Sequence, residues 1–283
     1  MTLWFLLNRH RNCRTLTARD IAARLKAAGV SNPFQESLWL IAHAVGRTHA
    51  QILAGDEFSP DEERRVDAVI SRRIAGEPLQ YILGAADFCG RDFAVGPGVL
   101  ISRHDTETLI EGVKGCFARD DSFRFADWGT GSGCIAVTIL LEFPNASGVA
   151  VDVSGEALSY ARENAGYWGV DGRLETGGHV SGEFDLIVSN PPYIPSGEIA
   201  GLPCDVRDYE PNLALDGGVD GMTCYREIFA LAGKVLRPGG YIILEAGDMS
   251  QVHALANWGE PFAFDCAIMD AGNFPRCIVI RRI

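Results

Sequence analysis

A glycine-rich turn between an expected strand and an expected helix constrains the fold of this 283-residue chain most strongly. Residues 123–127 form an apolar run typical of a buried strand, and residues 134–142 carry apolar side chains at the spacing of an amphipathic helix. Between them lies the run Asp127-Trp128-Gly129-Thr130-Gly131-Ser132-Gly133. Glycines let the backbone approach a ligand closely, and the start of the following helix offers free N–H groups. A strand, a tight turn and a helix in this order predict a strand–helix–strand unit.

The alternation of strands and helices continues to the C-terminus. Parallel strands need crossover helices, so this order is typical of an α/β fold with a mostly parallel sheet. The last two expected strands have no helix between them and should form an antiparallel hairpin. Strands are expected at residues 124–127, 148–152, 172–176, 185–189, 240–245, 262–268 and 277–282, and helices at 132–142, 155–166, 222–236 and 250–257.

The first part of the chain carries helix start signals instead of strands. Thr17, Asn32 and Ser59 stand where helix caps are expected, and Pro33 and Pro60 occupy first helical positions. Helices this short are stabilised by packing on one another, so we expect a small helical bundle. The expected domain boundaries are 1–16 for a disordered extension, 17–84 for the N-terminal helical domain, 85–100 for a hairpin linker with its turn at residues 90–92, and 101–283 for the α/β domain.

A second informative segment, Asn190-Pro191-Pro192-Tyr193, directly follows the strand at 185–189. Two successive prolines supply no backbone N–H, so the strand must end there, at the sheet edge where ligands bind in open α/β folds. Asn190 Oδ1 and the Pro191 carbonyl can each accept one N–H, and Tyr193 can stack on a planar group. An amide or base amine has a delocalised lone pair, and two acceptors on its hydrogens would aim that lone pair at an electrophile. The alternative is a proline-rich turn with a helix-capping Asn.

The glycine-rich turn and Asp152 predict a nucleotide-type cofactor. Asp152 lies about 20 residues after Gly133, the spacing at which an acid reaches ribose hydroxyls. A dinucleotide is the alternative, although Cys134 stands where its fingerprint has Gly or Ala. The tight glycine spacing, the acid before it and the later Asn-Pro-Pro-Tyr segment favour S-adenosylmethionine. The candidate cofactor residues are Asp127, Gly129, Thr130, Gly131, Ser132, Gly133, Asp152 and Asn190.

Composition narrows the class of protein. The chain has a formal net charge of −12, whereas a DNA-modifying enzyme is expected to carry a basic surface that binds phosphates. One basic stretch does exist, because residues 1–30 hold six Lys or Arg and one acid. No apolar run approaches the roughly 18 residues of a membrane span. The eight cysteines are dispersed without metal-ligand spacing, so we expect no metal, no disulfide framework and a reducing cytoplasm. Cys134, at the start of a helix, is expected to be a small packing residue.

The chain resembles the protein N5-glutamine methyltransferases that modify peptide chain release factors, the HemK or PrmC family. The similarity runs from about Thr17 to the C-terminus. Two departures are a serine at Ser102 where the family usually has proline, and Gly178 where it usually has an acid. The matching motifs are Gly76-Glu77-Pro78-Leu79-Gln80-Tyr81-Ile82-Leu83-Gly84, Pro97-Gly98-Val99-Leu100-Ile101, Asp105-Thr106-Glu107, Gly217-Gly218-Val219-Asp220-Gly221, Pro238-Gly239-Gly240 and Glu245 with Gly247.

The resemblance implies a Rossmann-like, seven-stranded methyltransferase sheet with helices on both faces and an N-terminal helical bundle that seats the protein substrate. It implies methyl transfer from S-adenosylmethionine to the glutamine of a Gly-Gly-Gln motif. Asn190, Pro191 and Tyr193 would be catalytic, and Pro192 would join them in binding the substrate. His179 would cover the adenine face, with an exposed loop histidine as the alternative.

Three classes of function remain open at this point. The first is a release-factor glutamine methyltransferase, with a ribosomal-protein glutamine methyltransferase as its nearest alternative. The second is a nucleic-acid amine methyltransferase, because the same four residues suit adenine N6. Base flipping would need a recognition domain for which no residues remain. The third, a non-enzymatic binding module, is disfavoured by the intact catalytic segment. We therefore expect a cytoplasmic monomer that acts on a protein, with no direct contact to nucleic acid or membrane.

Overall fold

The structure is a computed structural model that describes residues 17–55 and 57–283. The chain divides into two compact units, with the boundary between Leu83 and Gly84. The expected extension at residues 1–16 lies outside the described residues. None of the helices described is both long and apolar enough to cross a membrane.

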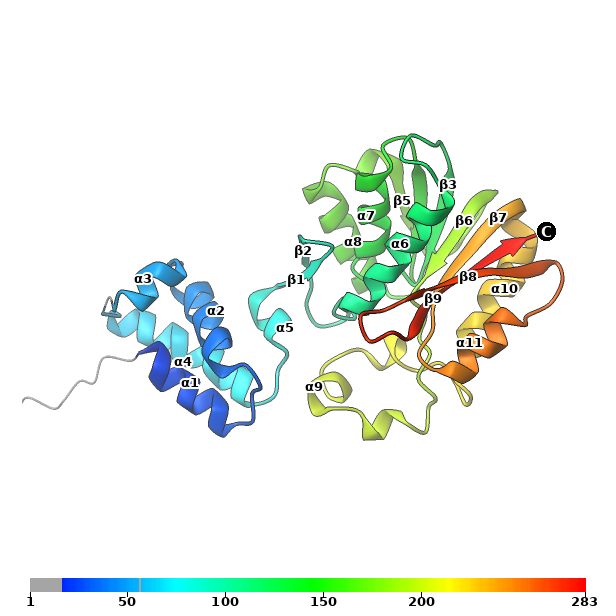
Figure 1. Cartoon of the computed structure of the whole chain (residues 1–283). Coiled ribbons are helices and arrows are strands. Elements are labelled where there is room, and N and C mark those ends of the chain that lie inside the picture. The colour runs from blue at the N-terminus through cyan, green and yellow to red at the C-terminus, as the bar shows by residue number, and fades with distance from the viewer. Residues whose placement is uncertain (1–16, 56) are drawn as a thin grey trace, which may run out of the picture. The chain divides into compact units, whose positions relative to one another are not determined.

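The first unit is helical (Figure 1). Its core is a cluster of apolar side chains contributed mainly by the three longer helices, and Ile21, Leu40 and Val66 in it are fully buried. A small helical bundle was predicted, and this is confirmed. The helices are α1 (Ala18–Ala27), α2 (Pro33–Val45), α3 (His49–Leu53), α4 (Pro60–Ile74) and α5 (Leu79–Leu83).

All three residues lie at the N-cap positions predicted for them, but only two of them form the capping box. The side chains of Thr17 and Ser59 accept the N–H groups of Asp20 and Glu62, whose carboxylates bond back to the cap N–H groups. Asn32 makes no such side-chain hydrogen bond. Its helix still begins at the next residue, Pro33, because proline has no N–H to satisfy and its fixed φ suits a first turn.

The second unit is built on a seven-stranded sheet with strand order β5-β4-β3-β6-β7-β9-β8. The first four pairings along this order are parallel, and the pairings of β9 with β7 and β8 are antiparallel. The predicted α/β class, with a mostly parallel sheet and a C-terminal antiparallel pair, is therefore confirmed. The strands are β3 (Arg124–Trp128), β4 (Ser147–Val151), β5 (Leu174–Gly177), β6 (Phe184–Ser189), β7 (Leu236–Glu245), β8 (Phe262–Met269) and β9 (Pro275–Arg282).

Helices cover both faces of this sheet (Figure 1). One apolar cluster joins the sheet to α6, α7 and α8, and a second joins its other face to α10 and α11. The helices are α6 (Glu107–Cys116), α7 (Cys134–Glu142), α8 (Gly155–Tyr167), α9 (Cys204–Arg207), α10 (Thr223–Val235) and α11 (Met249–Ala256), with short 3-10 turns η1 (His104–Thr106), η2 (Asp171–Arg173), η3 (Ile199–Gly201) and η4 (Asn212–Ala214).

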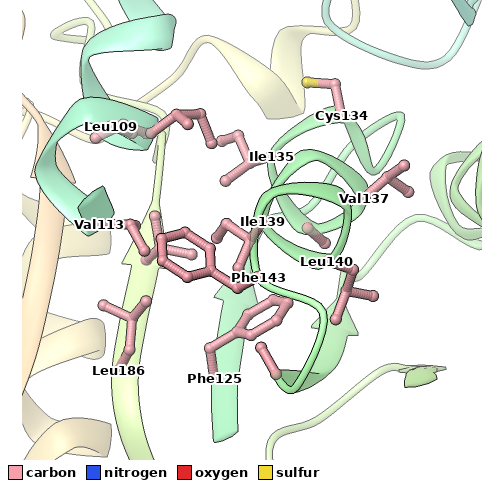
Figure 2. Packing of buried hydrophobic residues seen from close by; sticks show 14 of the residues in the cluster. Leu109, Val113, Phe125, Cys134, Ile135, Val137, Ile139, Leu140, Phe143 and Leu186 are labelled. Atoms are coloured by element: carbon pink, nitrogen blue, oxygen red, sulfur yellow. The ribbon is translucent and has the colours of Figure 1, made fainter. Parts of the chain in front are cut away.

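Helix α7 is not amphipathic, which corrects the sequence-based expectation. Every residue from Cys134 to Leu140 is buried, because α7 contacts the sheet as well as both neighbouring helices, α6 and α8. Figure 2 shows Ile135 and Ile139 of this helix packed among side chains from α6 and the strands. A helix buried on all sides has no polar face, and its start is held firmly beneath the glycine-rich turn.

A two-stranded hairpin, β1 (Ala85–Phe88) and β2 (Arg91–Ala94), opens the second unit. Its turn lies at Cys89 and Gly90, one residue earlier than predicted. Both residues have positive φ, 53° and 71°, as a two-residue hairpin turn of the primed type requires. Cysteine rarely adopts this conformation, so the sequence pattern did not reveal the turn. Phe88 and Phe93 from the two strands are fully buried in the core of the unit.

Candidate functional site

A cavity of about 430 Å³ lies at the carboxyl ends of three parallel strands, β3, β4 and β6. Trp128, Gly129 and Gly131 line it from the end of β3. The loops after β4 and β6 contribute further residues, among them Asp152, Val153, Asn190 and Pro192. Parallel strands end at one edge of a sheet, so predicted site residues far apart in sequence meet there.

The three glycines of the turn serve two different purposes. Gly129, Gly131 and Gly133 all have positive φ, at 70°, 55° and 80°. A Cβ atom built on Gly129 or Gly131 would meet no protein atom within 4 Å, and both residues line the cavity. A Cβ on Gly133 would lie 3.0 Å from Ala161 Cα in α8. The first two glycines therefore keep space open for a ligand, and the third lets two helices pack closely.

Asp127 supports the turn from below and does not line the cavity. It is fully buried, and its Oδ2 accepts a hydrogen bond of 2.6 Å from the Thr130 hydroxyl. Burial raises the pKa of Asp127 to about 7, against the opposing effect of the Thr130 hydrogen bond. Thr130 and Ser132 are also buried. These three predicted cofactor residues are placed to shape the turn.

The raised pKa of Asp127 predicts a pH-dependent stability. The folded protein keeps a proton on Asp127 up to about pH 7, whereas the unfolded chain releases it near pH 4. As the pH rises from about 4 to about 7, the free energy of unfolding should therefore fall, by up to about 1.4 kcal/mol per pH unit. Asp127→Asn keeps an acceptor for Thr130 but cannot titrate, so it should lack this part of the slope. Urea unfolding of both proteins across the range measures the difference, and parallel stability curves would contradict the prediction.

Asp152 is held in the cavity wall by two backbone groups. Its Oδ2 accepts the Gly131 N–H and its Oδ1 accepts the Ser154 N–H, both at 2.9 Å. Each carboxylate oxygen has a further lone pair to offer to a hydroxyl group in the cavity. Two apolar side chains that line the cavity are unusually exposed, Val153 at 79% and Leu213 at 59%. The wall therefore offers an acid for hydroxyls and apolar surfaces for a flat ring.

The predicted adenine contact at His179 remains a prediction. His179 is exposed and is not among the residues that line the cavity, whereas its neighbour Gly178 is. Sequence reasoning missed Trp128, Val153 and Leu213 as lining residues. An apolar residue just after the strand expected at 148–152, as at Val153, was the available signal.

The Asn-Pro-Pro-Tyr segment begins where β6 ends at Ser189. The Asn190 side chain donates from Nδ2 to the Thr106 hydroxyl, at 3.0 Å. Within the described part of the chain, no donor is bonded to Asn190 Oδ1 or to the Pro191 carbonyl. Both predicted acceptors are therefore free to bind a ligand.

Tyr193 is held more tightly than a free stacking surface would be. Its hydroxyl donates to Glu245 Oε1 at 3.1 Å, and burial together with the Glu245 charge raises the pKa of the phenol. A Cβ built on Gly247 would lie only 2.5 Å from the ring. Ring packing on a glycine and the hydroxyl contact to Glu245 fix the side chain.

A second cavity, of about 120 Å³, lies beside the Asn-Pro-Pro-Tyr segment. Arg103, Pro191 and Tyr193 line it, and it shares Leu100, Asn190 and Ala214 with the larger cavity. The two cavities therefore meet at Asn190. This arrangement can hold two reacting molecules, one in each cavity, on either side of a single amide group.

The Arg103 side chain of this second cavity is fixed by an ion pair. Its guanidinium lies 2.6 Å from Glu210 Oε1, and the Glu210 carboxylate is almost completely buried. Burial raises the pKa of Glu210, and the charge of Arg103 opposes that rise. A buried carboxylate needs such a partner, so this pair ties the segment before α6 to the segment after Asn-Pro-Pro-Tyr.

The cysteines in the described residues are reduced and bear no sign of a shared site. Cys134 is buried, and burial raises its pKa to about 12, which fits the predicted packing role. Outside the cavities, Asp87, His104 and Glu107 bring one potential ligand atom each within 4.8 Å of one another. Asp87 and His104 are exposed, and Glu107 already accepts the Cys89 N–H. Exposed acidic groups are common without an ion, so this cluster carries no metal assignment.

Two family descriptions match the chain in order. The PrmC N-terminal domain matches residues 18–84, and the methyltransferase small domain matches residues 105–200. A solved methyltransferase from Pyrococcus furiosus has the same fold, with a TM-score of 0.50 and 19% identity, over 78% of this chain and 98% of that one.

Curated relatives match nearly the whole chain. The release factor glutamine methyltransferase of Moorella thermoacetica is 40% identical over 93% of this chain and 96% of its own length. The protein of the same name from Agrobacterium fabrum is 39% identical over 95% of this chain and 98% of its own length. Identity at this level over both units confirms the resemblance found in the sequence motifs. The chain belongs to the release factor glutamine methyltransferase family.

Proposed function

We propose that the protein transfers a methyl group from S-adenosylmethionine to the side-chain amide nitrogen of the glutamine in the Gly-Gly-Gln motif of peptide chain release factors. The observation that carries this proposal is the position of Asn190, whose free Oδ1 lies where two cavities meet. The named activity of the relatives supports the same reaction.

The larger cavity fits the cofactor on three counts. Gly129 and Gly131 leave space that any side chain would fill. Asp152 offers carboxylate lone pairs suited to ribose hydroxyls, and Val153 and Leu213 offer apolar surfaces suited to a purine ring. When bound, S-adenosylmethionine supplies a methyl group made electrophilic by its positively charged sulfur.

The protein's own task is to prepare a poor nucleophile. A carboxamide nitrogen has a delocalised lone pair, and its two hydrogens need acceptors. Asn190 Oδ1 and the Pro191 carbonyl are the two acceptors free at this point. Holding both hydrogens would direct the nitrogen lone pair out of the amide plane, toward the larger cavity. Orientation of this kind can contribute several kcal/mol, so no strong base is required.

The smaller cavity would hold the glutamine side chain. Its lining is mostly apolar, from Leu100, Ile194 and Leu215 among others, and the Tyr193 ring forms part of the wall. Such a lining suits the methylene groups of glutamine, while the amide at their end meets Asn190. Arg103, fixed by Glu210, places one positive charge at the cavity and is suited to a peptide carbonyl.

The family assignment also favours a protein partner in the cytoplasm, where translation factors act. We propose that the enzyme works as a monomer on a release factor, without direct contact to nucleic acid. The net charge of −12 supports this choice, because an acidic surface repels phosphates.

Labelled S-adenosylmethionine and purified bacterial release factors test the proposed function. Mass spectrometry of the Gly-Gly-Gln peptide should show one added methyl group on the glutamine. A release factor with Glu in place of that Gln is the matched control and should stay unmodified. Methyl transfer to adenine-containing oligonucleotides, with none to release factor, would overturn the proposal.

Asp152→Ala should weaken binding of S-adenosylmethionine by about 1.5–3 kcal/mol, because charge-assisted hydrogen bonds to the cofactor are lost. The substitution also leaves the Gly131 N–H without its partner. Asp171→Ala removes an exposed carboxylate that does not line the cavity, and serves as the control. Calorimetric titration measures both affinities, and equal affinities in the two variants would remove Asp152 from the cofactor site.

A further inference from the structure

Gln251 is a buried amide that bonds to the Asn-Pro-Pro-Tyr segment and has no part in the reaction described above. It lies in the first turn of α11 and is only 2% exposed. Its Nε2 donates to the Tyr193 carbonyl at 2.8 Å and to the Gly221 carbonyl at 3.4 Å, and its Oε1 accepts the Gly247 N–H at 2.8 Å. Only one orientation of the amide satisfies all three partners, because only its nitrogen can donate. The side chain therefore joins three segments that lie far apart in the sequence.

The same segments pack directly on Tyr193, because each places a glycine against it. A Cβ built on Gly217 would lie 2.7 Å from Tyr193 Cα, and one on Gly221 would lie 2.4 Å from the Tyr193 carbonyl oxygen. A Cβ on Gly247 would lie 2.5 Å from the Tyr193 ring. Glycine has no side chain that could anchor these contacts. The hydrogen bonds of Gln251 hold Gly221 and Gly247 in place around the tyrosine.

The position of Tyr193 matters for the whole Asn-Pro-Pro-Tyr segment. Its ring is part of the wall of the smaller cavity, which Asn190 and Pro191 also line. The two prolines before Tyr193 have fixed φ angles, so the segment is stiff. A shift of the Tyr193 carbonyl would therefore be passed on to the two free acceptors, Asn190 Oδ1 and the Pro191 carbonyl.

We propose that Gln251 is a positioning residue for methyl transfer. By fixing the Tyr193 carbonyl, it keeps the two acceptors and the ring of the Asn-Pro-Pro-Tyr segment where the glutamine amide needs them. The inference rests on the proposed function, because it concerns the glutamine cavity of that reaction. Gln251 lines neither cavity and touches neither reacting molecule. Its loss should lower the rate of transfer and leave cofactor binding unchanged.

Asn164 in α8 is the matched comparison, because its buried amide makes the same set of hydrogen bonds elsewhere in the unit. It is 1% exposed, and its Oδ1 accepts the Ala94 N–H at 2.7 Å. Its Nδ2 donates to the carbonyls of Ala94 and Ser132, at 3.0 and 2.8 Å. These partners belong to the hairpin and the glycine-rich turn. Removing either amide takes a partner from one N–H and two carbonyls, so the two losses of stability should be similar.

Gln251→Met and Asn164→Leu each replace an amide by an apolar side chain of about the same size. Urea unfolding compares their stability, and the assays use conditions in which both are folded. With saturating S-adenosylmethionine, the single-turnover rate on release factor should fall by about 10–100-fold in Gln251→Met, the scale of a small misplacement of reacting groups. Its affinity for S-adenosylmethionine in calorimetric titration should stay at the wild-type level.

Asn164→Leu should keep a single-turnover rate near that of wild type when the cofactor is saturating. Any functional loss in this variant should appear in cofactor affinity, because Ser132 belongs to the glycine-rich turn. Equal losses of rate in the two variants would show that Gln251 contributes only stability, and would overturn the proposal. A wild-type rate in Gln251→Met would overturn it as well.

Gln251→Asn is a milder variant that keeps the test decisive if Gln251→Met does not fold. It retains the amide but shortens the side chain by one methylene group, so the amide can no longer reach Tyr193 and Gly247 together. The single-turnover rate should fall by a smaller factor, again with unchanged cofactor affinity. A wild-type rate in Gln251→Asn would show that this side chain does not set the position of the segment, and would reject the proposal.

A measurement without release factor separates this inference from the proposed function. In protein labelled with ¹³C at the ε positions of tyrosine, the signal lost in Tyr193→Phe assigns the Tyr193 ring. That signal should shift in Gln251→Met and keep its wild-type position in Asn164→Leu. An unshifted signal in Gln251→Met would reject the positioning role. A wild type that shows the expected pattern of shifts but leaves release factor unmodified would reject the proposed function alone.

Discussion

Replacing Asn190 with alanine should slow methyl transfer by about 10²–10³-fold, the usual cost of losing one positioned polar group in a reaction site. The loss should appear in the single-turnover rate and not in cofactor affinity, because the cofactor cavity has many other contacts. An unchanged single-turnover rate in Asn190→Ala would show that the amide of the substrate glutamine is held elsewhere. The Asn-Pro-Pro-Tyr segment would then be only a structural turn.

Asn190→Asp is the sharper variant, since it keeps both the size and an acceptor oxygen. One carboxylate oxygen would take the place of the Nδ2 group that donates to the Thr106 hydroxyl, so the hydrogen bond that now fixes the Asn190 side chain is lost unless Thr106 turns its own proton. We expect a folded, slow enzyme that still binds S-adenosylmethionine. Calorimetry and single-turnover kinetics on the same sample separate the two properties.

Gly131→Val should abolish measurable binding of S-adenosylmethionine. Its Cβ would meet no protein atom and would point into open space beside the cavity, where the ligand has to lie. The residue also has φ of 55°, a conformation that costs a branched residue about 1–2 kcal/mol. Strain alone could therefore lower stability and confuse the result.

Gly169→Val controls for that strain. Gly169 has φ of 69°, a Cβ there would also meet nothing within 4 Å, and the residue does not line the cavity. Both variants should lose similar stability in urea unfolding, but only Gly131→Val should fail in calorimetric titration with the cofactor. Near-native binding by Gly131→Val would mean that the glycine-rich turn does not contact the ligand.

The central strands β3, β4 and β6 were predictable because they are largely buried and read as continuous apolar runs. The helix α6 was not predicted, and the reason lies in its glycines. Gly112 interrupts the helical pattern, yet a Cβ there would lie 2.9 Å from the Cys277 sulfur of β9. Gly112 therefore weakens the helical signal of α6 in the sequence and at the same time lets α6 pack close to the sheet.

The parts of the candidate site that lie in one continuous stretch of sequence were predictable. The glycine-rich turn and the Asn-Pro-Pro-Tyr segment are continuous in the sequence, and their chemistry can be argued from neighbouring residues. The hydrogen bonds that orient the segment are not local. Thr106 is 84 residues from Asn190, and Glu245 is 52 residues from Tyr193. The sequence around Thr106 or Glu245 does not indicate these hydrogen-bond partners, because only the fold brings the residues together.

The hairpin at the start of the second unit has a consequence for exchanging parts between relatives. Phe88 and Phe93 are core residues of that unit, and the Asn164 side chain in α8 bonds to both the N–H and the carbonyl of Ala94. Chimeras joined at Gly84 should therefore inherit an intact catalytic unit with a foreign helical unit in front of it. Chimeras joined at residue 101 would exchange two core phenyl rings and should be less stable. Recombination at Gly84 thus offers a way to exchange the helical unit between relatives without disturbing the core of the second unit.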